Sequence, residues 1–326
     1  MRPDGRQNDG RDQGSGGPGN GRRSGWPDAG GTVRAVVRAG SERAAAGVMA
    51  VCRGVLPKVG RAEHAEPGAE ALRAAWAEME RRPPADGEAG GGRLLVLAGY
   101  RAPWVQVRNL ERSLVRLTHR REVVAVAYPT AGTVAGVLAR VRAALDEAWP
   151  GWPGWTDGHA VDVVGVSMGG LVGRSLAMGL DGESLAATER RLAVRRMITL
   201  CSPHRGAVAA EWVRPDALAG QMRAGSAWLR AINAAETGGG GRGYPLIAYT
   251  QTADWLVGAS RSVPEGAPDG GPGPGDAHVH LRGRLVMSHF LVSSERAVLV
   301  DVARRLRGEG AVMDHQSTRP RSGAGS

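Results

Sequence analysis

The sequence predicts an α/β protein with a mostly parallel sheet flanked by helices. Short, continuous apolar runs alternate with longer segments of helical periodicity between residues 93 and 307. Continuous apolar runs are typical of strands buried on both faces, as the strands of a parallel sheet are. The chain has 326 residues, which is enough for one large domain of this kind with further residues at both ends.

The expected strands and helices alternate along this region. The strands are expected at residues 93–98, 122–128, 159–166, 194–200, 245–251 and 284–287, and the helices at residues 104–117, 133–149, 168–180 and 292–306. Strands separated by helices of this length imply a parallel sheet that is covered on both faces.

The segments around this domain have a different composition. Residues 1–31 are rich in Gly, Arg, Asp, Asn, Gln, Ser and Pro and predict a disordered tail, because they cannot bury enough apolar surface to order themselves. Residues 32–92 predict an N-terminal helical extension and a Gly-rich linker, with the clearest helix from Pro67 to Arg81. Residues 93–307 form the main domain, and residues 308–326 a second disordered tail.

Two inserts interrupt the expected strand and helix series. Residues 203–233 contain apolar helical pieces and predict a lid-like insert over the site. Residues 260–280 are rich in Gly and Pro and predict a surface loop.

The charge does not indicate nucleic-acid binding. The formal net charge is +10 and the isoelectric point is about 10.8, but Lys58 is the only lysine and the arginines are interleaved with acids, as in residues 189–191 and 301–305. A nucleic-acid-binding domain would instead concentrate its basic residues on one face or stripe.

The cysteines and the hydropathy pattern also narrow the class of protein. Cys52 and Cys201 are too few for a disulfide framework and belong to no Cys/His cluster of the kind that binds zinc, so we expect two small buried side chains. The run from Ala44 to Cys52 is far too short to cross a membrane and is a poor signal peptide. The expected localisation is cytoplasmic.

The segment Gly165-Val-Ser167-Met-Gly169 is the clearest chemical motif of the chain. An apolar strand leads directly into it and an amphipathic helix leads out of it, which is the setting that a G-x-S-x-G nucleophile turn requires. The glycines allow close backbone approach, and the start of the helix points N–H groups at the place where negative charge develops. The alternative is a serine in a tight glycine turn that only packs a helix on a strand.

Three further stretches accompany this motif. They are Ala98-Gly99-Tyr100, the octapeptide Thr-Leu-Cys-Ser-Pro-His-Arg-Gly at residues 199–206, and Met287-Ser-His289-Phe. With the serine motif they resemble the α/β-hydrolase superfamily, and in particular its bacterial lipase and esterase branch, over residues 93–307. Ala98 and Val166 stand where many relatives have His, which leaves open how the oxyanion loop is held and which subfamily this is.

The resemblance implies an α/β-hydrolase fold and a Ser-His-Asp triad. Ser167 is the expected nucleophile, and His289, just before the last helix, is the expected base, with His278 and His280 as alternatives. The acid is expected at Asp254, which follows a strand, because the fold orders its triad as serine, acid and histidine. Asp216 and Asp269 are the weaker candidates for the acid, since neither directly follows a predicted strand.

Other site residues follow from the same resemblance. The backbone N–H groups of Met168 and Tyr100 are expected to form the oxyanion hole. The side chains of Tyr100 and Trp104 either line an acyl pocket or take part in ordinary loop packing. We expect His204 to be structural, because the loop that carries it packs beneath the insert in the similar family stretch.

The implied function is hydrolysis of carboxylic esters, acyl or lipid esters above all, through an acyl-enzyme. This chemistry needs no metal and no organic cofactor. The expected partner is a small-molecule or lipid ester and no nucleic acid, and transient contact with a lipid surface is compatible with the sequence. Thioesterases, amidases and acyltransferases use the same triad, and a non-catalytic protein of this fold could bind a lipid or a partner, so these alternatives stay open.

Overall fold

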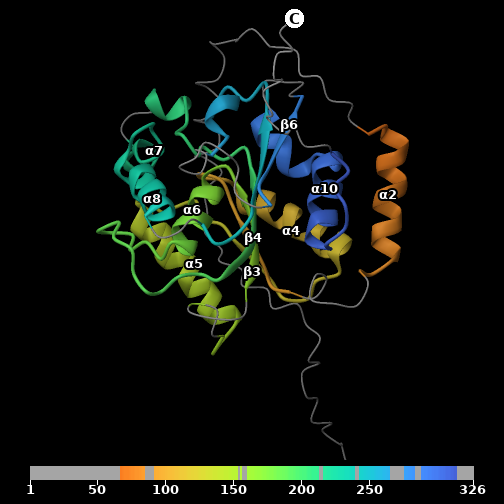
Figure 1. Cartoon of the computed structure of the whole chain (residues 1–326), viewed down its shortest axis with the longest axis horizontal. Helices are drawn as coiled ribbons and strands as arrows, with labels where there is room; N and C mark the ends of the chain where they lie inside the picture. Colours follow the sequence, from red (N-terminus) through yellow and green to blue (C-terminus); the bar gives the residue numbers. More distant parts are fainter. Residues whose placement is uncertain are drawn as a thin grey trace, which may run out of the picture. The chain divides into compact units, whose positions relative to one another are not determined.

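A single parallel sheet organises the chain (Figure 1). The computed structural model describes residues 67–84, 92–152, 155, 160–212, 216–238, 242–264, 275–282 and 288–313. The strands are β1 (Leu94–Leu97), β2 (Val123–Val126), β3 (Val161–Val166), β4 (Val194–Leu200), β5 (Leu246–Gln251) and β6 (Ala277–Leu281). Their order is β2-β1-β3-β4-β5-β6 and every neighbouring pair is parallel, so the predicted α/β class is confirmed.

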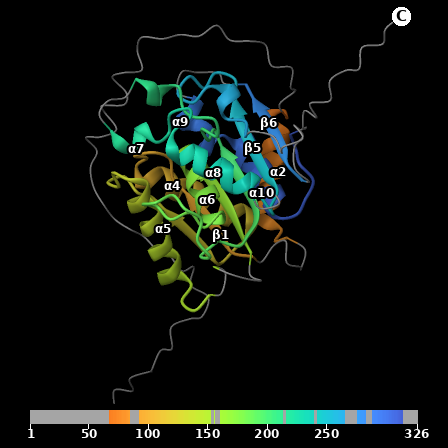
Figure 2. The same cartoon turned by 60° about the vertical axis from the view of Figure 1, so that its left-hand side comes forward.

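Helices cover both faces of this sheet (Figures 1 and 2). On one side lie α4 (Trp104–Thr118) and α10 (Arg296–Leu306), and α2 (Ala69–Arg81) packs against both of them. On the other side lie α5 (Val134–Ala148), α6 (Met168–Ala177) and α8 (Ala227–Thr237). None of the helices in the described ranges is long and apolar enough to cross a membrane.

The core follows from the apolar pattern of these elements. All six residues of β3 are buried, as expected for a central strand with a helix layer on each face. Helix α5 buries Val137, Leu138, Val141 and Leu145 along one side, and the Thr133 hydroxyl caps its start by accepting the Gly136 N–H at 3.0 Å.

The last third of the chain differs from the sequence prediction. The expected surface loop contains β6, whose residues are alternately buried and half-buried and pair with β5. The strand expected at residues 284–287 lies outside the described residues. The single closing helix expected at residues 292–306 is instead a 3-10 turn (Val292–Ser294) and α10, because Glu295 takes an extended conformation between them, and a short helix α9 (Ser288–Leu291) precedes the turn.

The insert divides into two parts. Helix α8 packs on α6, where Trp228 Nε1 donates to Ser175 Oγ at 2.8 Å and Arg174 pairs with Glu236 at 2.7 Å. This part therefore belongs to the helical layer. The preceding part, with a 3-10 turn (Ala209–Glu211) and α7 (Ala217–Gly220), packs against the loop after β5, where the Ala209 N–H donates to the Leu256 carbonyl at 2.8 Å.

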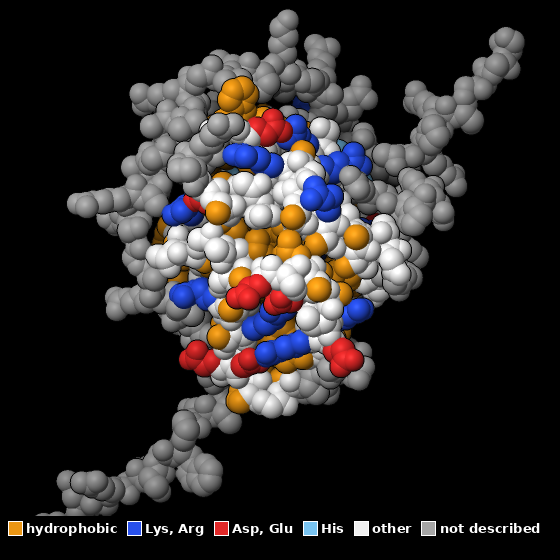
Figure 3. Space-filling view, turned by 90° about the vertical axis from the view of Figure 1, so that its left-hand side faces the viewer, with side chains coloured by type: hydrophobic (Ala, Val, Ile, Leu, Met, Phe, Trp, Pro, Cys, Tyr) orange, Lys and Arg blue, Asp and Glu red, His pale blue; other side chains and the backbone are white. Residues whose placement is uncertain are grey.

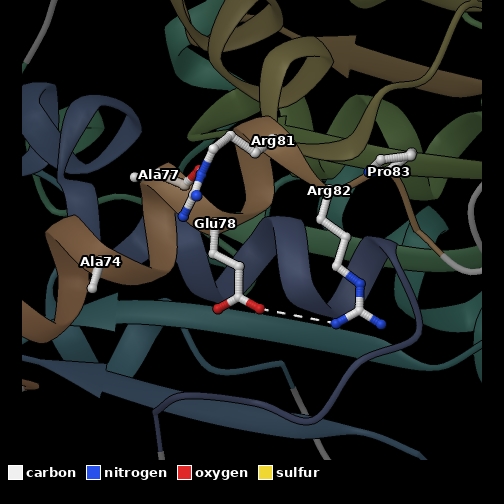
Figure 4. A pocket seen from close by; sticks show the side chains of 6 residues that line it. All are labelled: Ala74, Ala77, Glu78, Arg81, Arg82 and Pro83. Carbon is white, nitrogen blue, oxygen red and sulfur yellow. Dashed lines mark hydrogen bonds and ion pairs between the residues drawn. The ribbon is translucent and has the colours of Figure 1, made fainter.

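Helix α2 is fixed to the domain at its C-terminal end. Leu72 and Met79 are buried, and the Met79 carbonyl accepts from His119 at 2.8 Å and from Arg307 at 3.3 Å. Its exposed side carries a surface pocket lined by Ala74, Ala77, Glu78, Arg81, Arg82 and Pro83, in which Glu78 and Arg82 lie 3.9 Å apart (Figure 4). Its only acidic lining residue, Glu78, is paired with Arg82. The predicted tail 1–31, the first part of the predicted extension (residues 32–66) and residues 314–326 lie outside the described part. The tail predicted from residue 308 is wrong for residues 308–313, because Met313 is buried and its N–H donates to Asp301 Oδ1 at 3.1 Å.

The glycines around Ser167 are required by close backbone packing. A Cβ at Gly165 would lie 2.5 Å from the carbonyl carbon of Gly169, and a Cβ at Gly169 would lie 2.5 Å from the Leu97 oxygen. Both distances are far shorter than a carbon atom tolerates. Helix α6 can therefore start directly against β1 and β3 only if these positions are glycine.

We expect Gly169→Ala to destabilise the protein by about 1–3 kcal/mol, because the new methyl group must push the Leu97 carbonyl or the start of α6 out of place. The matched control is Gly220→Ala, a helical glycine whose Cβ would meet no atom within 4 Å and which should be neutral or slightly stabilising. Urea unfolding measures both variants. Equal stability of Gly169→Ala and wild type would contradict the close packing described here.

Candidate active site

Residues at the carboxyl edge of the sheet converge on one place. Ser167 directly follows β3, Cys201 directly follows β4, Asp254 comes shortly after β5, and His289 lies in α9. In an open parallel sheet the carboxyl ends of all strands share one edge, where the loops can assemble a site. This edge brings together residues that are up to 122 positions apart in the sequence.

Ser167 occupies a sharp turn between β3 and α6. Its backbone angles are φ 51° and ψ −120°, a left-handed conformation that is uncommon for a residue other than glycine. Its N–H donates to the Leu200 carbonyl at 2.8 Å and its carbonyl accepts from the Gly170 N–H at 3.1 Å. The turn is therefore held by β4 on one side and by α6 on the other.

A continuous chain of hydrogen bonds links three of the predicted site residues. His289 Nε2 lies 3.0 Å from Ser167 Oγ, and His289 Nδ1 lies 2.8 Å from Asp254 Oδ2. A base within reach of a hydroxyl, itself oriented by a third group, is the arrangement that activates a serine for nucleophilic attack.

The Asp254 carboxylate is buried and well supported. Its Oδ1 atom accepts the N–H groups of Leu256 and Val257, each at 3.0 Å, while Oδ2 faces His289. Burial alone would raise the pKa of Asp254, but the His289 ring and these two N–H groups outweigh it and lower the pKa below the usual value. The group is therefore a carboxylate at neutral pH.

The segment that carries His289 is held from both sides. Gln106, in α4, donates to the Phe290 carbonyl at 3.0 Å and to Ser293 Oγ at 3.3 Å. Gln251, at the end of β5, donates to Glu295 at 2.7 Å. No local sequence pattern indicates these two glutamines, because each bonds to a segment more than 40 residues away.

The loop after β1 lies directly against Ser167. A Cβ at Gly99 would lie 3.3 Å from Ser167 Cβ. Within the described ranges, the N–H groups of Tyr100 and Met168 donate to no backbone oxygen. Met168 is also the first residue of α6, where the helix dipole favours negative charge. Gly99, which precedes Tyr100, and Met168, which follows Ser167, thus both lie beside the serine.

The Tyr100 side chain ties this loop to the insert. Its hydroxyl donates to Asp216 Oδ2 at 2.5 Å, Arg101 Nε donates to the same oxygen at 3.0 Å, and Asp216 Oδ1 caps α7 through the Leu218 N–H at 2.9 Å. Asp216, an alternative acid in the sequence analysis, is therefore bonded to the loop after β1. The ring of Trp104 lies 4.3 Å from the Arg108 guanidinium, and its role in an acyl pocket stays a prediction.

The other histidine and aspartate candidates lie elsewhere. His278 and His280 are on β6, the edge strand, where His280 Nδ1 lies 2.9 Å from Thr250 Oγ1. His204 is fully buried between Thr199 and Arg174, and burial together with the Arg174 charge lowers its pKa. This agrees with the structural role expected for His204. Asp269 lies outside the described residues.

Cys201 is a member of the site that the sequence analysis treated only as a buried apolar residue. Its side chain is fully buried, and burial, reinforced by the Asp254 carboxylate, raises the pKa of its thiol. The thiol is therefore a neutral neighbour of the charged acid. Its position immediately after β4, the strand beside β3, was the signal that could have placed it here.

The titration of Tyr100 tests the link between the loop after β1 and the insert. Burial, reinforced by the Asp216 carboxylate, raises the pKa of Tyr100 to about 12. A folded pKa above the unfolded value of about 10 means that the neutral phenol contributes stability below that pH, and that this contribution disappears as the pH rises through about 12. Asp216→Asn keeps an N-cap for α7 but removes the charge, so it should lower the Tyr100 pKa part of the way toward 10.

Phenolate absorbance, taken as the difference from the matching Tyr100→Phe protein, isolates this residue from the other three tyrosines. An unchanged Tyr100 pKa in Asp216→Asn, or ionisation near 10 in the wild type, would contradict the link.

Comparisons with known proteins report a likeness of fold. No family model and no curated protein matches the chain. Among solved structures, the chain is similar to lipase BlEst2 of Bacillus licheniformis in its propeptide form (12% identity, TM-score 0.46, 72% of this chain and 54% of that chain). It is also similar to a gene product of Listeria innocua (10% identity, TM-score 0.47, 68% of this chain and 96% of that chain). A third similar structure is a lipase-esterase related protein of Clostridium acetobutylicum (12% identity, TM-score 0.42, 68% of this chain and 97% of that chain). The chain spans about half the length of the Bacillus chain.

The fold itself is a parallel α/β sheet whose central strand β3 ends directly before Ser167. A parallel sheet with helices on both faces carries a strand, a one-residue turn at Ser167 and a helix at its centre. The predicted fold class is thereby confirmed.

Proposed function

We propose that this protein is a serine hydrolase that cleaves carboxylic esters, with Ser167 as nucleophile, His289 as general base and Asp254 as the orienting acid. The observation that carries the proposal is the unbroken chain of hydrogen bonds from Ser167 Oγ through the imidazole to the Asp254 carboxylate, with both distances at 3.0 Å or less. These distances are within the range required for proton transfer to a base.

Acylation begins when His289 Nε2 takes the proton of Ser167 Oγ and the oxygen attacks the ester carbonyl. The tetrahedral intermediate places its negative oxygen against the N–H groups of Met168 and Tyr100. Loss of one such donor typically costs about 3–4 kcal/mol of transition-state stabilisation. The imidazolium then gives its proton to the leaving alcohol, and the acyl group stays on Ser167.

Deacylation repeats these steps with water in place of the serine hydroxyl. His289 removes a proton from the water, which attacks the acyl-enzyme, and then returns the proton to Ser167 Oγ. Asp254 stays ionised throughout. It holds the imidazole in the tautomer whose Nε2 faces the reaction and stabilises the imidazolium.

Exposed apolar side chains favour an ester with an apolar acyl group. Val105, Leu291 and Trp212 are 56%, 42% and 77% exposed. Val105 follows the oxyanion loop, Leu291 comes two residues after His289, and Trp212 lies in the first part of the insert. Large apolar side chains left in water on the segments that form a site are typical of surfaces that meet an apolar partner. They support a lipid-like ester and transient contact with a lipid surface.

Other functions of this arrangement differ in measurable ways. A thioesterase would prefer acyl thioesters to oxygen esters, and an acyltransferase would form a new ester when an alcohol is added. A non-catalytic protein would bind an acyl chain without turnover. Binding alone does not require a base, an acid and a strained serine in one hydrogen-bonded chain. The arrangement therefore favours an enzyme over a non-catalytic binding protein.

The test is hydrolysis of p-nitrophenyl esters of short and long acyl chains. Ser167→Ala and His289→Ala should each lower kcat by about 10⁴ to 10⁶, and Asp254→Asn by about 10⁴, because the three groups act as one unit. Ser184→Ala, which alters an exposed serine outside the site, is the matched control and should retain full activity. The chain-length profile of the wild type distinguishes an esterase from a lipase.

Folding of each variant is checked by circular dichroism. A wild-type protein that is inert on every chain length, or a Ser167→Ala protein that keeps its activity, would refute the proposed function.

A further inference from the structure

Cys201 has an unusual backbone for its position. It lies directly after β4 with φ at 51°, the left-handed region, and its N–H donates to the Tyr249 carbonyl at 2.8 Å. A non-glycine residue in this region is strained, and such residues cluster at functional sites. The Cys201 side chain is fully buried beside the proposed triad.

Three different donor atoms meet at this point. The Cys201 Sγ atom, a carboxylate oxygen of Asp254 and a ring nitrogen of His289 all lie within 4.8 Å of one another. The three residues come from the loop after β4, the loop after β5 and α9, and each is buried. No other group of three such donors was found among the described residues.

The donor set matches a thiophilic divalent cation. Thiolate, imidazole and carboxylate are the ligands of zinc, at about 2.3 Å for sulfur and about 2.0–2.2 Å for nitrogen and oxygen. In a tetrahedral site these lengths place neighbouring ligand atoms roughly 3.2–3.6 Å apart. The Asp254 and His289 atoms, now 2.8 Å apart, would have to separate by only about half an ångström.

We infer that Cys201, Asp254 and His289 form an inhibitory binding site for Zn²⁺ within the catalytic centre. The inference rests on the proposed function for its effect on activity, but the binding itself does not depend on turnover. No metal site was predicted here, because Cys201 lies 53 and 88 residues from its two partners (254 − 201 and 289 − 201) and forms no local Cys/His motif with them.

Binding of Zn²⁺ would inhibit ester hydrolysis because it changes where the protons of Cys201 and His289 lie. The Cys201 thiol loses its proton to solvent and binds the cation as a thiolate. In His289 the proton moves from Nδ1 to Nε2, so that Nδ1 binds the cation and the ring stays neutral. The net change is one proton released for each Zn²⁺ bound. An imidazole with its proton on Nε2 can no longer accept the Ser167 proton, so the nucleophile is not activated.

The burial of the site predicts slow binding. His289 is 8% exposed and Cys201 is fully enclosed, so the cation can reach the site only when the surrounding residues move. Inhibition should therefore develop with time after Zn²⁺ is added and reverse slowly when EDTA removes the metal.

The binding experiment uses Cd²⁺, which shares the ligand preference of Zn²⁺ and gives a thiolate-to-metal absorption band in the ultraviolet. The full-length wild type and Cys52→Ala, the matched variant of the only other cysteine, should show this band at one Cd²⁺ per chain. Cys201→Ala should not show it. Cys201→Gly is the second variant, because glycine accepts a φ of 51° without strain and so keeps the fold if alanine does not.

The activity experiment then adds Zn²⁺ during hydrolysis of a p-nitrophenyl ester. We expect time-dependent inhibition of wild type and Cys52→Ala, and at least about tenfold weaker inhibition of both Cys201 variants, since a metal ligand is lost. Absence of a Cys201-dependent cadmium band, or equal inhibition of all four proteins, would overturn the inference. A protein that binds Cd²⁺ through Cys201 but hydrolyses no ester would keep the metal site and overturn only the proposed hydrolase.

Discussion

Strand β3 must end and helix α6 must begin within one residue, and the geometry of the site depends on this turn. Because β3 pairs with β1 and β4 along both edges, the turn can lead only out of the sheet, and Ser167 takes up a left-handed conformation to make it. The close approach of Gly165 and Gly169 to neighbouring backbone lets α6 start against β1. The same contact presses the loop after β1 against Ser167, so the serine hydroxyl and the two proposed oxyanion donors are positioned together.

The two ends of β3 are held by different interactions. At its start, buried Asp162 pairs with Arg120 at 2.5 Å, Arg195 at 2.6 Å and Arg196 at 2.9 Å. Burial alone would raise the pKa of Asp162, but these cations outweigh it and lower the pKa, so the carboxylate stays charged. Such clusters rarely add much net stability, but loss of the acid would leave buried guanidinium groups without their counter-charge.

On the molecular surface that carries α5 and α8, arginines also lie beside acidic side chains, and Figure 3 shows positive and negative side chains interspersed there.

The sequence predicted the parts of the fold that local patterns determine. Five of the expected strands, the serine turn and the helix after it are where the apolar runs and the Gly-x-Ser-x-Gly spacing put them. Strand β6 was missed because it is only five residues long and comes directly after a long Gly- and Pro-rich stretch. The alternation of buried and half-buried side chains along it is recognisable only once β5 is known to pair with it. Contacts between distant loops could not be predicted. Asp216 bonds to Tyr100, Gln106 holds the segment after His289, and Cys201 lies against Asp254, and each depends on how strands meet at one edge.

The central claim is that Ser167 is an activated nucleophile, and covalent labelling tests it most directly. A fluorophosphonate reacts with a serine whose hydroxyl is deprotonated by a neighbouring base, whatever the natural substrate is. The account predicts one adduct per chain, mapped by mass spectrometry to Ser167 and lost in a folded His289→Ala protein. A folded wild-type protein that forms no adduct, or an adduct on another serine, would contradict it.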